Sequence, residues 1–345
     1  MSVEYKGVQW NRQKRIYDFV LVGGVALYLL IFGAVTEFYF PFVTQETLIM
    51  RAFGTAAFLL LHIILCIGPL CRLNPKFLPL LYNRRHAGVT CFVLGLIHAV
   101  MVVATYHAGA DTNPILSIFI TNRLTGSLAG VPFQPFGFFA LVILFLMAAT
   151  SHDFWLANLT APVWKALHML VYVAYALLVL HVTFGALQGE TSGLYGATMA
   201  IGLLTVVTLH RVAARIERRR DQELTTFSAD GFADVCAVAD ILENRARIVC
   251  LSGERVAIFK YGGKISAVSN VCQHQNGPLG EGKILDGCIT CPWHGYQYVP
   301  ETGASPPPFV EKIPTFNVRV QNGRVFVHPK PNPAGTKAEP ALLEK

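Results

Sequence analysis

Six apolar stretches fill the first 210 residues of this 345-residue chain, and they limit the folds that are open to it. They cover residues 17–36, 52–70, 87–104, 136–149, 167–187 and 195–209. Some are shorter than the ~20 residues that a perpendicular membrane crossing needs. Because 53% of all residues are hydrophobic and only 14% are charged, the chain is too apolar for an ordinary soluble protein. We therefore expect an all-α membrane bundle of six helices over residues 16–210.

Positive charge gathers beside alternate apolar stretches. It precedes the first stretch, fills the connection before the third and follows the sixth, at Arg12, Lys14, Arg15, Arg72, Lys76, Arg84, Arg85, Arg211, Arg215, Arg218, Arg219 and Arg220. The opposite connections carry Glu37, Glu46 and Asp111. Cytoplasmic connections are enriched in Lys and Arg, so we predict a bacterial-type inner membrane protein with both termini in the cytoplasm. This placement also accounts for the net charge of +7 without a nucleic-acid partner.

The remainder of the chain has the composition of a soluble domain. Alternating segments such as "ARIVCL", "VAIFKY" and "NVRVQNGRVFVHP" predict short strands, and "YGGK" and "QNGR" predict hairpin turns. We expect a small all-β domain over residues 227–329. It would follow a cytoplasmic arm at 1–15, the bundle at 16–210 and a charged linker at 211–226, and it would precede a flexible tail at 330–345.

Two Cys-His pairs in this domain predict a metal site. Cys272 is followed by His274 with one residue between them, and Cys291 by His294 with two, and sixteen residues separate the pairs. Two thiolates and two imidazoles suit either a tetrahedral zinc site or an iron–sulfur cluster. Cys236, Cys250 and Cys288 are interpreted as strand residues rather than ligands.

The motif resembles the signature of the Rieske family, C-x-H followed by C-P-x-H-G. The resemblance implies that Cys272 and Cys291 hold one iron of a [2Fe-2S] cluster and that His274 and His294 hold the other. It extends to "ETGASPPPF", where the family places a Pro-rich loop over the cluster, and it makes zinc the alternative metal.

Departures from the Rieske proteins of cytochrome bc complexes point to a ferredoxin-type module. Two further Cys of those proteins are replaced here by Gly277 and Trp293, and a hydrogen-bonding Ser by Tyr296, while Tyr298 matches their Tyr. Fewer donors to the cluster imply a potential toward the low end of about −150 to +300 mV. The missing disulfide also suits a reducing cytoplasm.

Histidines inside the apolar stretches predict a second cofactor, since ionisable residues in a membrane are costly. His86 directly precedes the third stretch and His98 lies on it, while His168 and His181 lie on the fifth, so the two pairs are about 18 and 20 Å apart along two parallel helices. Twelve residues rotate a helix by about +120° and thirteen by about −140°. This spacing favours two b-type haems, an inner one on His86 and His168 and an outer one on His98 and His181. His62 and His107 are interpreted as helix contacts or as neighbours of a haem propionate or a quinone rather than as ligands.

The segments "CIGPLCRL", "RRHAGVTCFVLGLIH" and "WKALHMLVYVAYALLVLH" resemble the ferric-reductase-like transmembrane domain of NADPH oxidases, ferric reductases and the haem subunit of the periplasmic methionine sulfoxide reductase system. The last of these is the best match. The resemblance implies haem ligands at His98, His168 and His181. His86 matches no His of that subfamily but suits the two-haem arrangement of the oxidases, so one or two haems are expected.

A nicotinamide or flavin module normally follows such a membrane domain in reductases and oxidases, but no glycine fingerprint for a dinucleotide is found here. The Cys-His domain takes that place. We predict an electron-transfer protein that passes electrons between a cytoplasmic Rieske cluster and the haems, to or from a quinone or a periplasmic redox partner. The alternative is a quinol- or haem-based membrane redox subunit whose Rieske domain serves docking or redox sensing.

Overall fold

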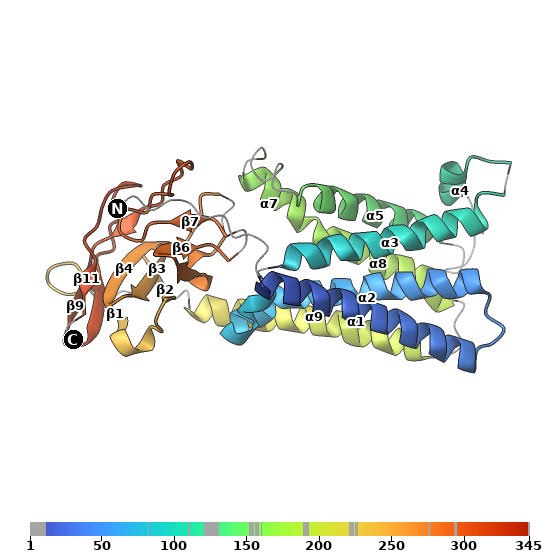
Figure 1. Ribbon diagram of the computed structural model, residues 1–345, viewed down its shortest axis with the longest axis horizontal. Coiled ribbons are helices and arrows are strands. Elements are labelled where there is room, and N and C mark those ends of the chain that lie inside the picture. Colours follow the sequence, from blue (N-terminus) through green and yellow to red (C-terminus); the bar gives the residue numbers. More distant parts are fainter. Residues whose placement is uncertain are drawn as a thin grey trace. The chain divides into compact units, whose positions relative to one another are not determined.

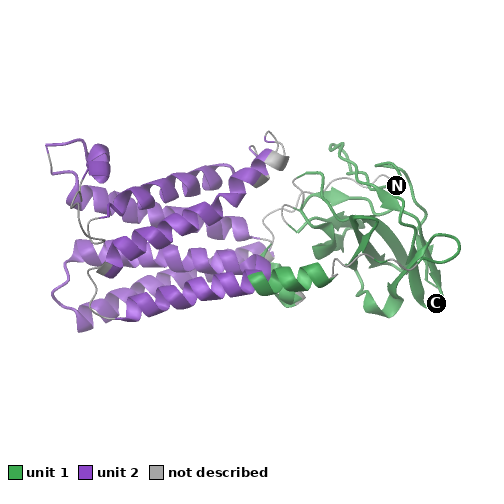
Figure 2. Cartoon of the chain, turned by 180° about the vertical axis from the view of Figure 1, so that it is seen from behind, with its two compact units in different colours: residues 1–11, 70–82, 211–345 green, residues 12–69, 83–210 purple. Residues whose placement is uncertain are grey.

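The chain folds into a part built of helices and a part built of strands (Figure 1). The computed structural model describes residues 12–81, 83–109, 111–120, 131–151, 155, 159, 161–188, 193–220, 224, 227–274, 277–292 and 295–343. The chain divides into two compact units (Figure 2). The helical unit comprises Arg12–Pro69 and Asn83–His210, and the β unit comprises residues 1–11, Leu70–Tyr82 and Arg211–Lys345.

The longer helices run alongside one another as a bundle (Figure 1). They are α1 (Arg12–Tyr39), α2 (Gln45–Leu73), α3 (Arg84–Tyr106), α5 (Gln134–Ala149), α8 (Val171–Phe184) and α9 (Gly193–Arg220). Shorter elements are η1 (Pro75–Leu80), α4 (Pro114–Ile120), α7 (Ala161–Met169) and η3 (Ala186–Gln188). Apolar side chains of α2, α3, α8 and α9 form the main core, among them Leu61, Cys91, Tyr175 and Val206.

Five helical segments of the described chain are long and apolar enough to cross a membrane. These segments are 14–39, 45–73, 84–106, 166–184 and 193–219. The remaining apolar helix, α5, has 16 residues and therefore spans about 24 Å, less than the ~30 Å of a hydrocarbon core. The protein is a multi-pass membrane protein, and the expected bundle of six spans consists of five long helical segments and one shorter helix.

The fifth apolar stretch departs from the single helix expected over 167–187. Helix α7 ends at Met169 and α8 begins at Val171, with Leu170 between them in a turn. The N–H of Leu170 bonds to the carbonyl of Leu167 at 3.1 Å, a tighter i→i−3 contact than an α-helix makes. His168 and His181 therefore lie on either side of this turn, although Leu170 itself has αR dihedral angles and residues 166–184 form one candidate span.

Over its described residues, the β unit contains three small antiparallel sheets, as the alternating sequence pattern predicts. The strands are β1 (Ala233–Ala237), β2 (Arg245–Leu251), β3 (Glu254–Tyr261), β4 (Lys264–Ser269), β5 (Lys283–Leu285), β6 (Cys288–Thr290), β7 (Gln297–Tyr298), β8 (Thr315–Phe316), β9 (Val318–Gln321), β10 (Arg324–Val327) and β11 (Ala341–Leu342). They pair in the orders β1-β10-β9, β11-β4-β3-β2 with β8 on β4, and β5-β6-β7.

Strand β3 lies between two apolar cores. Val256 and Ile258 point into one core, and Ala257 and Phe259 point into the other, because neighbouring strand residues face opposite sides. The predicted hairpin at Asn322-Gly323 is confirmed, since it joins β9 to β10 with both residues at positive φ. The second core contains both cysteines of the Cys-His motif, so the sheets place this motif on a rigid base.

Two expectations about the ends of this domain differ from the structure. Residues 330–345 are not a flexible tail over their described part, because Ala341 and Leu342 pair with β4 and the N–H of Ala338 bonds to the carbonyl of Glu301. The edge of β4 offers backbone groups that residues 341–342 can pair with. The polar composition of residues 330–345 does not reveal this pairing. In the expected linker, residues 211–220 continue helix α9.

Candidate functional site

The first Cys-His pair lies on a loop that follows β4 and closes on itself. The N–H of Cys272 bonds to the carbonyl of Gly277 at 2.9 Å, and Val271 forms a bridge with Pro278. Beneath the loop, the side-chain oxygen of Asn270 accepts the N–H of Gly280 at 2.7 Å. These bonds hold the Cys272 thiol, which is almost fully buried, against the second core.

Cys291, the first residue of the second pair, lies on the hairpin between β6 and β7. The N–H of Cys291 bonds to the carbonyl of Tyr296 at 2.8 Å, and the N–H of Gly295 bonds back to the carbonyl of Cys291 at 3.0 Å. Gly295 has a φ of 75°, a conformation that glycine adopts without strain. Cys291 is as buried as Cys272 and belongs to the same core, so the two loops bring both thiols to one region.

Tyr298 on β7 connects the two loops. Its hydroxyl oxygen accepts the N–H of Gln273 at 3.0 Å and lies 3.4 Å from the sulfur of Cys272. Burial, together with the neighbouring thiols of Cys272 and Cys291, raises the pKa of Tyr298 above its ordinary value. The phenol therefore keeps its proton and can donate it in a hydrogen bond to a cysteine thiolate.

Tyr296, which is buried in the second core, contacts His274 and the Pro-rich segment. Its ring stacks on His274 with centroids 4.6 Å apart and planes at 8°, and it meets Phe309 of the Pro-rich segment edge-on at 5.0 Å. Its hydroxyl donates to the carboxylate of Glu311. Since the hydroxyl is held by Glu311, Tyr296 orients the His274 ring instead of replacing the Ser that donates to sulfur in related domains. No sequence pattern pointed to Glu311.

The described donors fit a Rieske cluster in their chemistry. Two buried thiols, one imidazole and a phenol that can donate to sulfur meet the needs of a thiolate-bound iron. His294 and its neighbour Trp293 lie outside the described residues, and within the described residues no three His, Cys, Asp or Glu form a group that could hold a metal. Cys288 lies in β6, where burial raises the pKa of its thiol to about 11.

In the helical unit, His98 and His181 face each other. The Nδ1 of His98 donates to the carbonyl of Met50 at 2.8 Å, and the Nδ1 of His181 donates to the carbonyl of Phe133 at 2.9 Å. Each bond fixes the neutral tautomer that leaves the Nε2 lone pair for a metal. The ring centroids are 6.4 Å apart with planes at 84°.

Gly54 and Gly137 leave the space that the rings of His98 and His181 occupy. A Cβ on Gly54 of α2 would lie 2.8 Å from the Nδ1 of His98, and one on Gly137 of α5 would lie 2.7 Å from the Nδ1 of His181. The Nδ1 sides of both rings therefore press on helix backbones, and the Nε2 sides point away from them. With metal–nitrogen bonds of about 2.0–2.1 Å, the separation of the rings leaves room for one metal atom between two imidazoles.

His168 has a ring nitrogen without a hydrogen-bond partner among the described residues. On α7 its Nδ1 donates to the carbonyl of Trp164 at 3.0 Å, and its ring stacks on the Trp164 ring at 3.7 Å. Its Nε2 is buried and has no hydrogen-bond partner among the described residues. Because a buried polar atom is normally paired, this nitrogen is suited to bind an iron.

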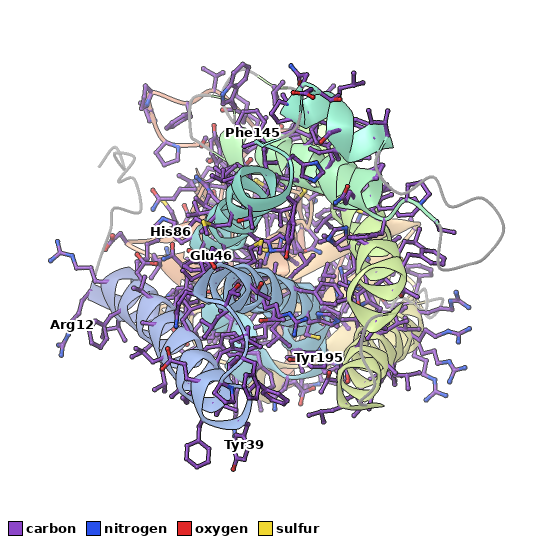
Figure 3. The ribbon with its side chains drawn as sticks, turned by 90° about the vertical axis from the view of Figure 1, so that its right-hand side faces the viewer. Arg12, Tyr39, Glu46, His86, Phe145 and Tyr195 are labelled. Atoms are coloured by element: carbon purple, nitrogen blue, oxygen red, sulfur yellow. The ribbon has the colours of Figure 1, made fainter. Side chains whose placement is uncertain are left out.

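His86 lies at the edge of the bundle, on the same side as Arg12 in Figure 3. Its side chain is 46% exposed, and its Nδ1 lies 2.9 Å from a carboxylate oxygen of Asp18 on α1. The starts of α1 and α3 therefore meet at one end of the bundle. The ring nitrogens of His86 and His168 are thus held by different groups, that of His86 by a carboxylate and that of His168 by a backbone carbonyl.

His62 and His107 are helix contacts, as predicted. The Nδ1 of His62 bonds to the carbonyl of Phe58 at 2.8 Å, and its Nε2 accepts the hydroxyl of Tyr175 at 3.0 Å. His107 contacts the Ser117 hydroxyl through Nδ1 and the Gln134 amide nitrogen through Nε2. With both nitrogens engaged in each ring, neither has one to offer to a metal.

Comparison with known proteins finds two families along the chain. A family described as "Rieske [2Fe-2S] domain" matches residues 231–317, and one described as "Ferric reductase like transmembrane component" matches residues 53–179. The first contains Cys272, His274, Cys291 and His294, and the second contains His86, His98 and His168 but ends before His181.

Several ferredoxins are similar to part of this chain. The ferredoxin component of the alkene monooxygenase system of Xanthobacter autotrophicus is 30% identical over 103 residues, which are 30% of this chain and 84% of that protein. The ferredoxin component of the naphthalene 1,2-dioxygenase system of Pseudomonas putida is 30% identical over 95 residues, 27% of this chain and 91% of that protein. A solved structure, the ferredoxin of carbazole 1,9a-dioxygenase from Nocardioides aromaticivorans IC177, is 24% identical and covers 29% of this chain and 98% of its own, with a TM-score of 0.27.

Proposed function

Because the chain belongs to the Rieske [2Fe-2S] family and carries a ferric-reductase-like transmembrane component, we propose that it carries electrons between a Rieske cluster and b-type haem in the membrane. A Rieske domain binds a [2Fe-2S] cluster, which supplies one-electron chemistry, and the fusion to a membrane domain supports a membrane electron-transfer role. The finer assignment of ligands, haem number and partner is our proposal.

We assign the cluster to Cys272, His274, Cys291 and His294. Each cysteine begins a loop that its own N–H closes, so the thiols are positioned before any metal binds. Tyr298 donates toward the Cys272 sulfur, and Tyr296 fixes the plane of the His274 ring. These side chains orient the ligands and keep water from the thiols.

We assign an outer haem to His98 and His181 and an inner haem to His86 and His168. The observation that carries the proposal is the facing pair His98 and His181, each with Nδ1 bonded to a backbone carbonyl. The buried Nε2 of His168, which has no hydrogen-bond partner among the described residues, supports a second site thirteen residues along the chain from His181.

Alanine substitution of the paired histidines tests the haem assignment. His98→Ala and His181→Ala should each remove the same outer haem, with equal loss of pyridine haemochrome and the same missing step in an optical redox titration. His62→Ala is the matched control, because His62 is also a buried membrane histidine but both of its nitrogens are engaged. Loss of different haems in the two variants, or an equal loss in His62→Ala, would contradict the pairing.

We propose that the β unit and both termini face the cytoplasm of a bacterial-type inner membrane, and that a quinone or a periplasmic redox protein takes or gives electrons at the other end. The charge of the connections supports this orientation. A reporter fused after Lys345 should behave as cytoplasmic, and one inserted near Asp111 should behave as periplasmic. A periplasmic C-terminal reporter would reverse the orientation.

A further inference from the structure

Asp18 is a carboxylate in an otherwise apolar part of helix α1. It lies in the second turn of the helix, and its side chain is only 18% exposed. One carboxylate oxygen lies 2.9 Å from the Nδ1 of His86 and also accepts the side-chain amide of Asn83, which is buried before α3. Because an ionisable group in a membrane helix is costly, this contact invites a functional explanation.

The contact sets the tautomer of His86. A carboxylate only accepts hydrogen bonds, so the Nδ1 of His86 must be the donor in this pair. In the neutral ring, the lone pair then lies on Nε2. The amide nitrogen of Asn83 lies 3.1 Å from the same Nδ1 and 2.5 Å from the Asp18 oxygen. Because the carboxylate can only accept, we assign the amide proton of Asn83 and the Nδ1 proton of His86 both to Asp18.

The acceptor differs from those of the other three histidines. His98, His168 and His181 each donate Nδ1 to a neutral backbone carbonyl, from Met50, Trp164 and Phe133. A carboxylate at the same position attracts the Nδ1 proton more strongly and makes the ring a more basic ligand. A more basic ligand stabilises ferric over ferrous iron.

We propose that Asp18 is a positioning residue for the inner haem. It holds His86 with its Nε2 available to iron, and it lowers the midpoint potential of that haem. The inference rests on the proposed function and adds a residue of α1, a helix outside the residues matched by the ferric-reductase family. Arg84 and Arg85 act electrostatically on His168, and their positive charge opposes the effect of Asp18. Both arginines are unchanged when Asp18 alone is altered. The difference in midpoint potential between the variant and the unaltered protein therefore reports the effect of the Asp18 carboxylate.

Asp18→Asn in the full-length chain is the test, because asparagine keeps the shape and can still accept a hydrogen bond from His86. We expect the affinity of the protein for one of its two haems, the inner one, to fall about 10–100-fold. A tenfold loss of preference for the ferric state would raise the potential of that haem by about 59 mV. Haem content, an optical redox titration and the EPR signal of ferric haem are the readouts. Glu37→Gln is the matched control, since Glu37 lies on the same helix about 28 Å away and contacts Gln45.

A purely structural contact between α1 and α3 would lower protein stability without moving a potential. An unchanged potential and EPR signal in Asp18→Asn would therefore overturn the proposal, and so would a shift in the potential of the haem that His86→Ala leaves in place. A shift confined to the haem that His86→Ala removes supports it. Failure of the proposed function is a separate outcome, because it would show as the absence of haem from the unaltered protein.

Discussion

Gly137→Ala is expected to displace the His181 ring. The added Cβ would lie 2.7 Å from the Nδ1 of His181, whereas ordinary contact begins at 3.4 Å, so the ring must move by about 0.7 Å. Metal–ligand distances tolerate only about 0.2 Å. The shift also weakens the 2.9 Å hydrogen bond from Nδ1 to the carbonyl of Phe133. Both effects act on the outer haem of the proposed pair.

We expect the variant to bind the outer haem at least tenfold more weakly, while the inner haem and the cluster remain. Overpacking of this kind costs typically 1–3 kcal/mol of stability. Haem per protein after purification, together with the outer step in a redox titration, measures the loss. Gly54→Ala should reproduce it through His98, because its Cβ would lie 2.8 Å from the Nδ1 of that ring.

Gly95→Ala is the control. Gly95 lies on α3 one turn before His98, but its Cβ would meet Leu141 at 3.6 Å, which is ordinary contact. Alanine is favoured over glycine inside a helix by roughly 0.5–1 kcal/mol, so this variant should keep both haems and its stability. A full content of outer haem with an unchanged spectrum in Gly137→Ala would refute the reasoning, since the His181 ring would then not be held as described.

Three further changes probe the β unit. Cys291→Ser should abolish the Rieske EPR signal and leave the haem Soret band, whereas stoichiometric zinc without iron in the unaltered protein would defeat the cluster assignment. Tyr298→Phe removes the donor toward the Cys272 sulfur and should lower the cluster potential in a titration followed by EPR; an unchanged value would show that the hydroxyl does not act on the cluster. Hydrogen bonds from the Arg319 guanidinium hold the pKa of Asp230 below its ordinary 3.8, so this pair stabilises the fold above that pH and the benefit is lost on acidification. The difference in stability between the unaltered protein and Asp230→Asn should therefore shrink as the pH falls below about 4, and a constant difference in urea unfolding would contradict the cause given.

The sequence by itself determined the two parts of the chain and the kind of chemistry in one of them. Long apolar stretches predicted the membrane helices, because the length of an apolar run can be read directly from the sequence and must match the thickness of the bilayer. The strands and the Asn322-Gly323 hairpin followed from alternation and turn residues. The spacing of Cys272, His274, Cys291 and His294 sufficed to identify the Rieske signature, because the two residues of each pair are close together in the sequence.

Tertiary structure alone decided which groups hold the ligands in place. The break at Leu170 separates His168 from His181, although the residues around it read as one helix. Phe133 and Asp18 lie 48 and 68 residues from the histidines they contact, and one of these contacts is through a backbone carbonyl. Every residue carries such a carbonyl, so a sequence pattern cannot single one out. Only the packing of helices distant in the chain selects which acceptor meets each ring nitrogen.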